Sequence, residues 1–89
     1  MIRITDDARS RLKKIWLNRV KKSDLILRLA LGRGGQLGLL AGKEQVSDEV
    51  YKEGRKKILL IAQELAVILS DMTLDIRDTK EGRILYILH

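Results

Sequence analysis

The chain has 89 residues, 45% hydrophobic and 34% charged, with no cysteine, no proline and no phenylalanine. This length and composition predict a single domain over residues 1–89 with enough Leu, Ile and Val to form a core. Without cysteine there is no disulfide, no thiolate nucleophile and no thiolate ligand, and a single histidine, His89, excludes multi-histidine zinc sites and histidine-based triads. The net charge of +6 arises within residues 1–22, which hold eight basic and two acidic side chains, because residues 23–89 hold ten of each.

The ends and the apolar segments of the chain predict a cytoplasmic protein with no membrane contact. The N-terminus is charged throughout and lacks the apolar region of a signal peptide. The most apolar stretch, residues 58–69, is interrupted by Gln63 and Glu64, and it is shorter than the roughly 20 apolar residues that a membrane span needs.

The first elements are a short strand and a helix. Residues 2–4 alternate in polarity and could pair at a sheet edge, and Thr5 before two aspartates is typical of a helix N-cap. We therefore expect a helix over residues 6–21. Its apolar face consists of residues at helical spacing, namely Ala8, Leu12, Ile15, Trp16 and Val20.

Two strands joined by a glycine-rich bend should follow. Residues 25–31 are a short, nearly continuous apolar run, which favours a buried strand. Four glycines then fall within seven residues, at positions 32, 34, 35 and 38, and this density breaks a helix and permits a tight turn. Residues 39–41 resume as a strand, and residues 43–57 are polar, with a turn at Gly54.

The segment 57–70 has two possible interpretations. Its residue types would accept one helix, but ten of the twelve residues 58–69 are apolar and leave no solvent face for a helix in so small a domain. A buried strand at 57–61 followed by a short helix at 62–70 distributes the apolar residues better. Residues 74–77 and 83–88, separated by a turn cluster, predict a hairpin.

No constellation of catalytic residues is found, so we expect the protein not to be an enzyme. The glycine segment 32–38 lacks both the third glycine of a dinucleotide fingerprint and the Gly-Lys-Ser/Thr of a P-loop. Asp75, Asp78 and Glu81 would diverge along a strand and its turn, so surface solubility explains them better than a metal site. The serines have no histidine base near them in the sequence.

The basic face of the predicted helix is the strongest remaining feature. Candidate partner-binding residues are Arg11, Lys14, Lys21 and Lys22, with Arg9 and Lys13 alongside. Such a face could bind nucleic acid phosphates or an acidic protein surface, although a run of charges is more often only a solvated helix face. Aromatic side chains for base stacking are scarce, which disfavours nucleic acid.

The ordered motifs resemble the HesB-like family of A-type iron–sulfur carrier proteins. Residues 2–8 resemble the opening I-x-I-T-D-x-A of the family, and residues 12–15 resemble its L-K-x-x helix. Residues 27–38 are similar to L-R-L-x-V-x-x-G-G-C-x-G, residues 74–76 to I-D-Y, and Gly82 with Leu85 to G-x-x-F. The resemblance implies a compact, β-rich α+β domain with mixed and antiparallel sheets and the N-terminal helix packed on them, often as a dimer.

The departures from the family concern its ligands. Family members hold iron or a cluster with one cysteine after the glycine pair and a Cys-x-Cys near the C-terminus. Here Gln36 follows Gly34 and Gly35, and the sequence stops at His89, at or before the expected position of the second pair. A neutral amide oxygen is a poor iron ligand beside a thiolate.

The sequence therefore predicts a cysteine-less, diverged HesB-like protein that acts as a non-catalytic binding or accessory module. No cofactor, no metal and no catalytic residue is expected. The expected partner is an unidentified protein or a second copy of the chain, and the alternative is a small basic protein that binds nucleic acid through the helix at 6–21.

Overall fold

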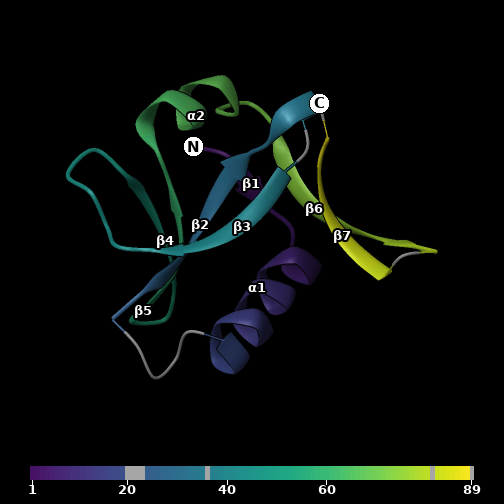
Figure 1. Ribbon diagram of the computed structural model, residues 1–89, viewed down its shortest axis with the longest axis horizontal. Helices are drawn as coiled ribbons and strands as arrows, with labels where there is room; N and C mark the ends of the chain where they lie inside the picture. Colours follow the sequence, from purple (N-terminus) through teal and green to yellow (C-terminus); the bar gives the residue numbers. More distant parts are fainter. Residues whose placement is uncertain (20–23, 36, 81, 89) are drawn as a thin grey trace.

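The computed structural model describes residues 1–19, 24–35, 37–80 and 82–88. Within this part of the chain, two β-sheets and an N-terminal helix surround one apolar core. The elements in chain order are β1 (Arg3–Ile4), α1 (Asp6–Arg19), β2 (Ile26–Leu31), a 3₁₀ turn (Arg33–Gly35), β3 (Leu37–Gly42), β4 (Glu49–Glu53), β5 (Lys56–Ile61), α2 (Gln63–Ile68), β6 (Thr73–Thr79) and β7 (Gly82–Leu88). Figure 1 shows α1 and α2 at opposite ends of the view, with the strands between them.

The smaller sheet has the strand order β1-β6-β7. β1 lies at its edge and runs parallel to β6, which confirms the expected edge strand at residues 2–4. β6 and β7 form the predicted antiparallel hairpin, in which Thr73 lies opposite Leu88 and Thr79 opposite Gly82. Gly82 has φ 113°, a conformation that a residue with a side chain rarely adopts, so glycine is needed where β7 begins.

The larger sheet has the strand order β3-β2-β5-β4, in which β2 and β5 are parallel and the two outer pairs are antiparallel. Because β3 and β4 lie at opposite edges, the connection 43–48 must cross β2 and β5, a span of about 14 Å at the usual strand spacing. This crossover explains why the polar segment between β3 and β4 has its length and composition. The sequence did not predict β4, because three of its five residues are charged.

Helix α1 packs its apolar face against both sheets, with contacts to β6, β5 and β2. Ala8 and Leu12 are fully buried, and Ile15 and Trp16 are partly buried against the core, as the helical spacing predicted. Val20 and the predicted end of the helix at residue 21 lie outside the described residues. The Lys56 ammonium lies over the Trp16 ring, 5.1 Å from its centroid, and this cation–π contact joins the helix to β5.

The segment 57–70 is a strand followed by a short helix, as favoured above. Residues 58–61 of β5 are all fully buried, so both faces of this central strand are covered. A helix in this position would expose apolar side chains to water, whereas a strand in the middle of a sheet buries them on both sides. α2 then spans only Gln63–Ile68, buries Ala66, and leaves Val67 and Ile68 exposed.

Candidate functional site

The glycine bend joins β2 to β3 and turns the chain back on itself. The two strands pair without interruption from Leu31 opposite Leu37 to Ile26 opposite Gly42. Gly34 has φ 76°, in the left-handed region that favours glycine, and no atom lies within 4 Å of the position that a Cβ would occupy. The bend is therefore a tight connection between strands, as the sequence indicated.

The bend and the C-terminal end of β7 come together at one end of the molecule. β3 contacts β7, and Figure 1 shows the end of β7 close to the connection between β2 and β3. Leu37 and Leu39 of β3, like Leu85 and Ile87 of β7, pack against the core. This end is where the resemblance places the family's cysteines, and its described side chains are apolar apart from Arg33.

The residues present do not fit a cluster held by thiolates. The 89 residues contain no cysteine, and in the described ranges no three His, Asp or Glu side chains are grouped so that they could hold a metal ion. Gln36, at the position of the first family cysteine, and His89 lie outside the described residues.

A hollow of about 320 Å³ lies between α1 and the β6–β7 hairpin. From the helix it is lined by residues spaced three and four apart, and these are Asp7, Ser10, Arg11 and Lys14. From the hairpin it is lined by residues that share one face of the two strands, and these are Ile76, Asp78 and Arg83. The hollow therefore brings Arg11 and Lys14, two of the predicted partner-binding residues, against a third cation from the far end of the chain.

Of the other predicted basic residues, Arg9 and Lys13 are described by the structure and do not line the hollow. Arg9 is committed to a structural contact, because its guanidinium donates a hydrogen bond to the carbonyl oxygen of Lys52 at 3.0 Å and lies 3.7 Å from Glu53. Lys13 is exposed and does not line the hollow. Lys21 and Lys22 lie outside the described residues.

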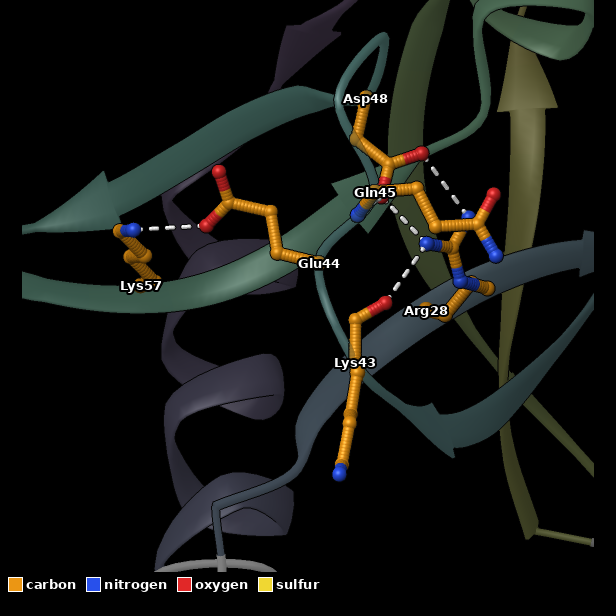
Figure 2. Close-up of polar contacts among 6 residues, drawn as sticks. All are labelled: Arg28, Lys43, Glu44, Gln45, Asp48 and Lys57. Atoms are coloured by element: carbon orange, nitrogen blue, oxygen red, sulfur yellow. Dashed lines mark hydrogen bonds and ion pairs between the residues drawn. The ribbon is translucent and has the colours of Figure 1, made fainter.

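Arg28 holds the crossover 43–48 against the larger sheet (Figure 2). Its guanidinium donates to both carboxylate oxygens of Asp48, one of them at 3.1 Å, and to the carbonyl oxygen of Lys43 at 3.1 Å. Asp48 also accepts the backbone N–H of Gln45 at 2.7 Å, and its side chain is only 2% exposed. The hydrogen bonds from Arg28 are the main reason that the pKa of Asp48 lies below its usual value, with the Gln45 N–H adding to the effect.

A second polar cluster joins the start of α1 to the smaller sheet. The Thr5 hydroxyl accepts the N–H of Ala8 at 3.2 Å, which confirms the N-cap, and donates to Asp75 at 2.7 Å. Asp75 also accepts the N–H of Ile76 at 2.8 Å and the Tyr86 hydroxyl at 3.2 Å. The Thr5 hydrogen bond is the largest of these effects, and together they hold the pKa of Asp75 below its usual value.

The carboxylates considered as a metal site diverge, as predicted. Asp75 and Asp78 are three residues apart on β6 and so lie on opposite faces of the sheet. Asp75 is held by Thr5 and Tyr86, whereas Asp78 lies in the hollow, 3.0 Å from the guanidinium Nε of Arg83. Glu81 lies outside the described residues.

The sequence reasoning missed Arg83, Asp7 and the Arg28–Asp48 pair. Arg83 joins Arg11 and Lys14 only through strand register and helix packing, and no local pattern signals that encounter. The pairing of Arg28 with Asp48 had a weak signal, because a lone arginine in an otherwise apolar strand needs an acidic partner when it is half-buried.

The two sheets with one long N-terminal helix form the fold of the A-type iron–sulfur carriers. The structure is similar to Escherichia coli SufA, a protein involved in the biosynthesis of iron–sulfur clusters, with a TM-score of 0.74 and 14% identity over 99% of this chain and 84% of SufA. It is also similar to IscA with a [2Fe-2S] cluster, with a TM-score of 0.60 and 17% identity over 100% of this chain and 82% of that chain.

A protein from Aquifex aeolicus studied by solution NMR gives a TM-score of 0.70 and 19% identity, over 99% of this chain and 90% of that chain. No protein-family model and no curated protein matches the sequence. At these identities the similarity shows the fold, and it confirms the fold class that the sequence motifs predicted. In the described part of the chain, neither helix is both long and apolar enough to cross a membrane.

Proposed function

We propose that the protein is a diverged A-type carrier that has lost cluster ligation and acts in the cytoplasm as a non-catalytic binding module. The observation that carries this proposal is the combination of the carrier fold with the complete absence of cysteine from the 89 residues. A carrier transfers its cluster through thiolates, so a chain with this fold and no thiolate keeps only the binding surfaces of the fold.

Two observations favour binding over catalysis. The half-buried polar side chains of Asp48 and Thr5 are held in structural contacts, since Asp48 is paired with Arg28 and Thr5 with Asp75. The hollow between α1 and the β6–β7 hairpin is lined by lysine, arginine, aspartate, serine and isoleucine side chains, with no histidine among them. Such a site supplies charge complementarity for a partner and lacks a base suited to activating the serine near neutral pH.

The test is anaerobic reconstitution of the purified protein with ferrous iron and sulfide, using IscA as the positive control. We expect no stoichiometric charge-transfer absorbance and no iron retained after desalting, whereas IscA should become coloured under the same conditions. A stoichiometric visible band on this protein would overturn the loss of cluster ligation.

Self-association is one mode of binding that the fold supports. β3 lies at the edge of the larger sheet, and its sequence over Leu37–Gly42 has no charged side chain. An uncharged edge strand with free backbone groups can pair with the same strand of a second copy, and a charge on the edge prevents such pairing.

We therefore expect Ala41→Lys to shift the protein toward monomer in sedimentation velocity experiments. Ala41 is exposed and lies within β3, so a lysine there adds charge to the edge. Val46→Lys is the matched control, because Val46 is fully exposed in the crossover and lies outside every strand. Equal behaviour of the two variants would argue against pairing through β3.

A further inference from the structure

The hollow between α1 and the β6–β7 hairpin contains cations that have no partner within the described chain. Arg11 is half-buried and Lys14 exposed, and neither makes a hydrogen bond or an ion pair with any residue that the structure describes. A half-buried guanidinium is most stable beside a negative charge, because partial burial removes water that would otherwise hydrate it. These two side chains therefore present unsatisfied positive charge to the hollow.

The remaining charges of the hollow can exchange partners at little cost. Arg83 pairs with Asp78 at 3.0 Å, but their side chains are 58% and 79% exposed, and an ion pair of that exposure contributes little to stability. Asp7 lies one turn before Arg11 on the helix without forming an ion pair with it in the described structure. An incoming anion could therefore engage Arg83 as well as Arg11 and Lys14.

We propose that this hollow docks an acidic peptide segment of a partner protein, with the carboxylates of the segment paired to Arg11 and Lys14. The inference rests on the proposed function as a binding module and names the partner chemistry of its basic helix. Ile76 lines the hollow and offers an apolar contact for the aliphatic part of an acidic side chain. Ser10 adds a hydroxyl that can donate to a carboxylate.

The composition of the hollow favours a peptide over a nucleic acid. Asp7 and Asp78 line the hollow, and their carboxylates would repel a continuous row of phosphates. A peptide can place a basic or neutral residue beside each of them and an acidic residue beside each cation. No aromatic side chain is among those that line the hollow, so a stacking surface for bases is missing there.

The test uses a fluorescein-labelled peptide of alternating glutamate and serine, and the same peptide with glutamine in place of glutamate. Fluorescence anisotropy at low salt should show binding of the glutamate peptide only, and the affinity should fall as salt is added. The double variant Arg11→Glu/Lys14→Glu should bind the glutamate peptide about tenfold or more weakly, because each change replaces an attraction with a repulsion.

The matched control is Lys13→Glu/Arg55→Glu, which changes the net charge equally at two exposed residues outside the hollow. This control should keep the affinity within about twofold of the unmodified protein, since charges away from the contact act weakly through screening salt. Equal losses in the two double variants would reduce the effect to net charge and overturn the site. Circular dichroism should show that both variants are folded.

Two further measurements, oligonucleotide binding and cluster reconstitution, distinguish failure of the docking inference from failure of the proposed function. A labelled oligonucleotide bound more tightly than the peptide, and lost in Arg11→Glu/Lys14→Glu alone, would overturn the acidic peptide in favour of nucleic acid. Absence of peptide binding together with absence of a reconstituted cluster would overturn the docking inference and leave the proposed function standing. A reconstituted cluster would overturn the proposed function whatever the peptide does.

Discussion

At the scale of single residues, Asp48 shows how a buried charge is maintained. Its carboxylate is almost completely enclosed, and it remains ionised because the Arg28 guanidinium and the Gln45 N–H supply three hydrogen bonds. Removal of the carboxylate would leave the Gln45 N–H without this acceptor, and the half-buried Arg28 would keep only the carbonyl oxygen of Lys43. Leaving donors without acceptors in a half-buried position lowers the free energy of unfolding by more than the intact pair contributes to it.

We expect Asp48→Ala to lower the free energy of unfolding by about 2 kcal/mol, measured by urea denaturation at neutral pH. The folded pKa of Asp48 is lowered, so its contribution is complete above the unfolded value of 3.8 and is lost as the pH falls through the folded value. The difference between variant and parent should therefore shrink in acid. Asp71→Ala, at an exposed residue, should change stability by no more than about 0.5 kcal/mol.

Thr5 is a second residue with two roles, because its hydroxyl caps α1 and donates to Asp75. Thr5→Ala should lower the free energy of unfolding by about 1 kcal/mol through loss of the cap. It should also raise the pKa of Asp75 toward the usual value, which carboxyl NMR titration measures. Thr5→Ser keeps the hydroxyl and should restore both properties, and failure of serine to do so would assign the effect to the lost methyl group.

At the scale of elements, the glycine bend shows which glycine the backbone requires. Gly34 has a left-handed φ and open space around it, whereas Gly38 has open space and no positive φ. Because neither position is crowded, a comparison of alanine substitutions at the two positions measures the effect of backbone conformation alone.

Gly34→Ala should destabilise the protein by about 1 kcal/mol, the usual cost of a left-handed residue with a Cβ. Gly38→Ala should leave the stability unchanged or raise it slightly, since alanine has less freedom in the unfolded chain. Thermal unfolding of the two variants side by side measures the difference. Equal melting temperatures would show that the bend can relax around Gly34.

At the scale of the whole molecule, α1 is the helix that packs against both sheets. It contacts β6 in the smaller sheet and β2 and β5 in the larger one, and Leu12 is fully buried at this junction. The apolar core that the helix covers contains residues of both sheets, so the apolar face of the helix contributes to the stability of the whole molecule.

Leu12→Ala should lower the free energy of unfolding by about 3 kcal/mol, because it removes buried methyl groups and leaves a cavity. That is a large share of the stability expected for a domain of this size. Leu17→Ala, on the same helix at an exposed position, should cost much less. Similar losses in urea denaturation would mean that Leu17 is covered in solution, as it would be in an oligomer.

The sequence alone determined the features that depend on neighbouring residues. Thr5 before two aspartates, the spacing of Ala8 and Leu12, the glycine bend and the hairpin at 74–88 were predicted because capping, periodicity and turn chemistry act over a few positions. The absence of cysteine is likewise a property of the sequence, and it separates this chain from the cluster chemistry of the fold. The net charge of residues 1–22 indicated Arg11 and Lys14 as candidate partner-binding residues.

Only the tertiary structure decided which charges meet. The hollow joins Arg11 to Arg83 across 72 positions of sequence, and Thr5 reaches Asp75 across 70. The partner of Arg28 is set by the strand order β3-β2-β5-β4, which sends residues 43–48 across the sheet. These contacts depend on register and packing between distant segments, and a local pattern carries no information about them.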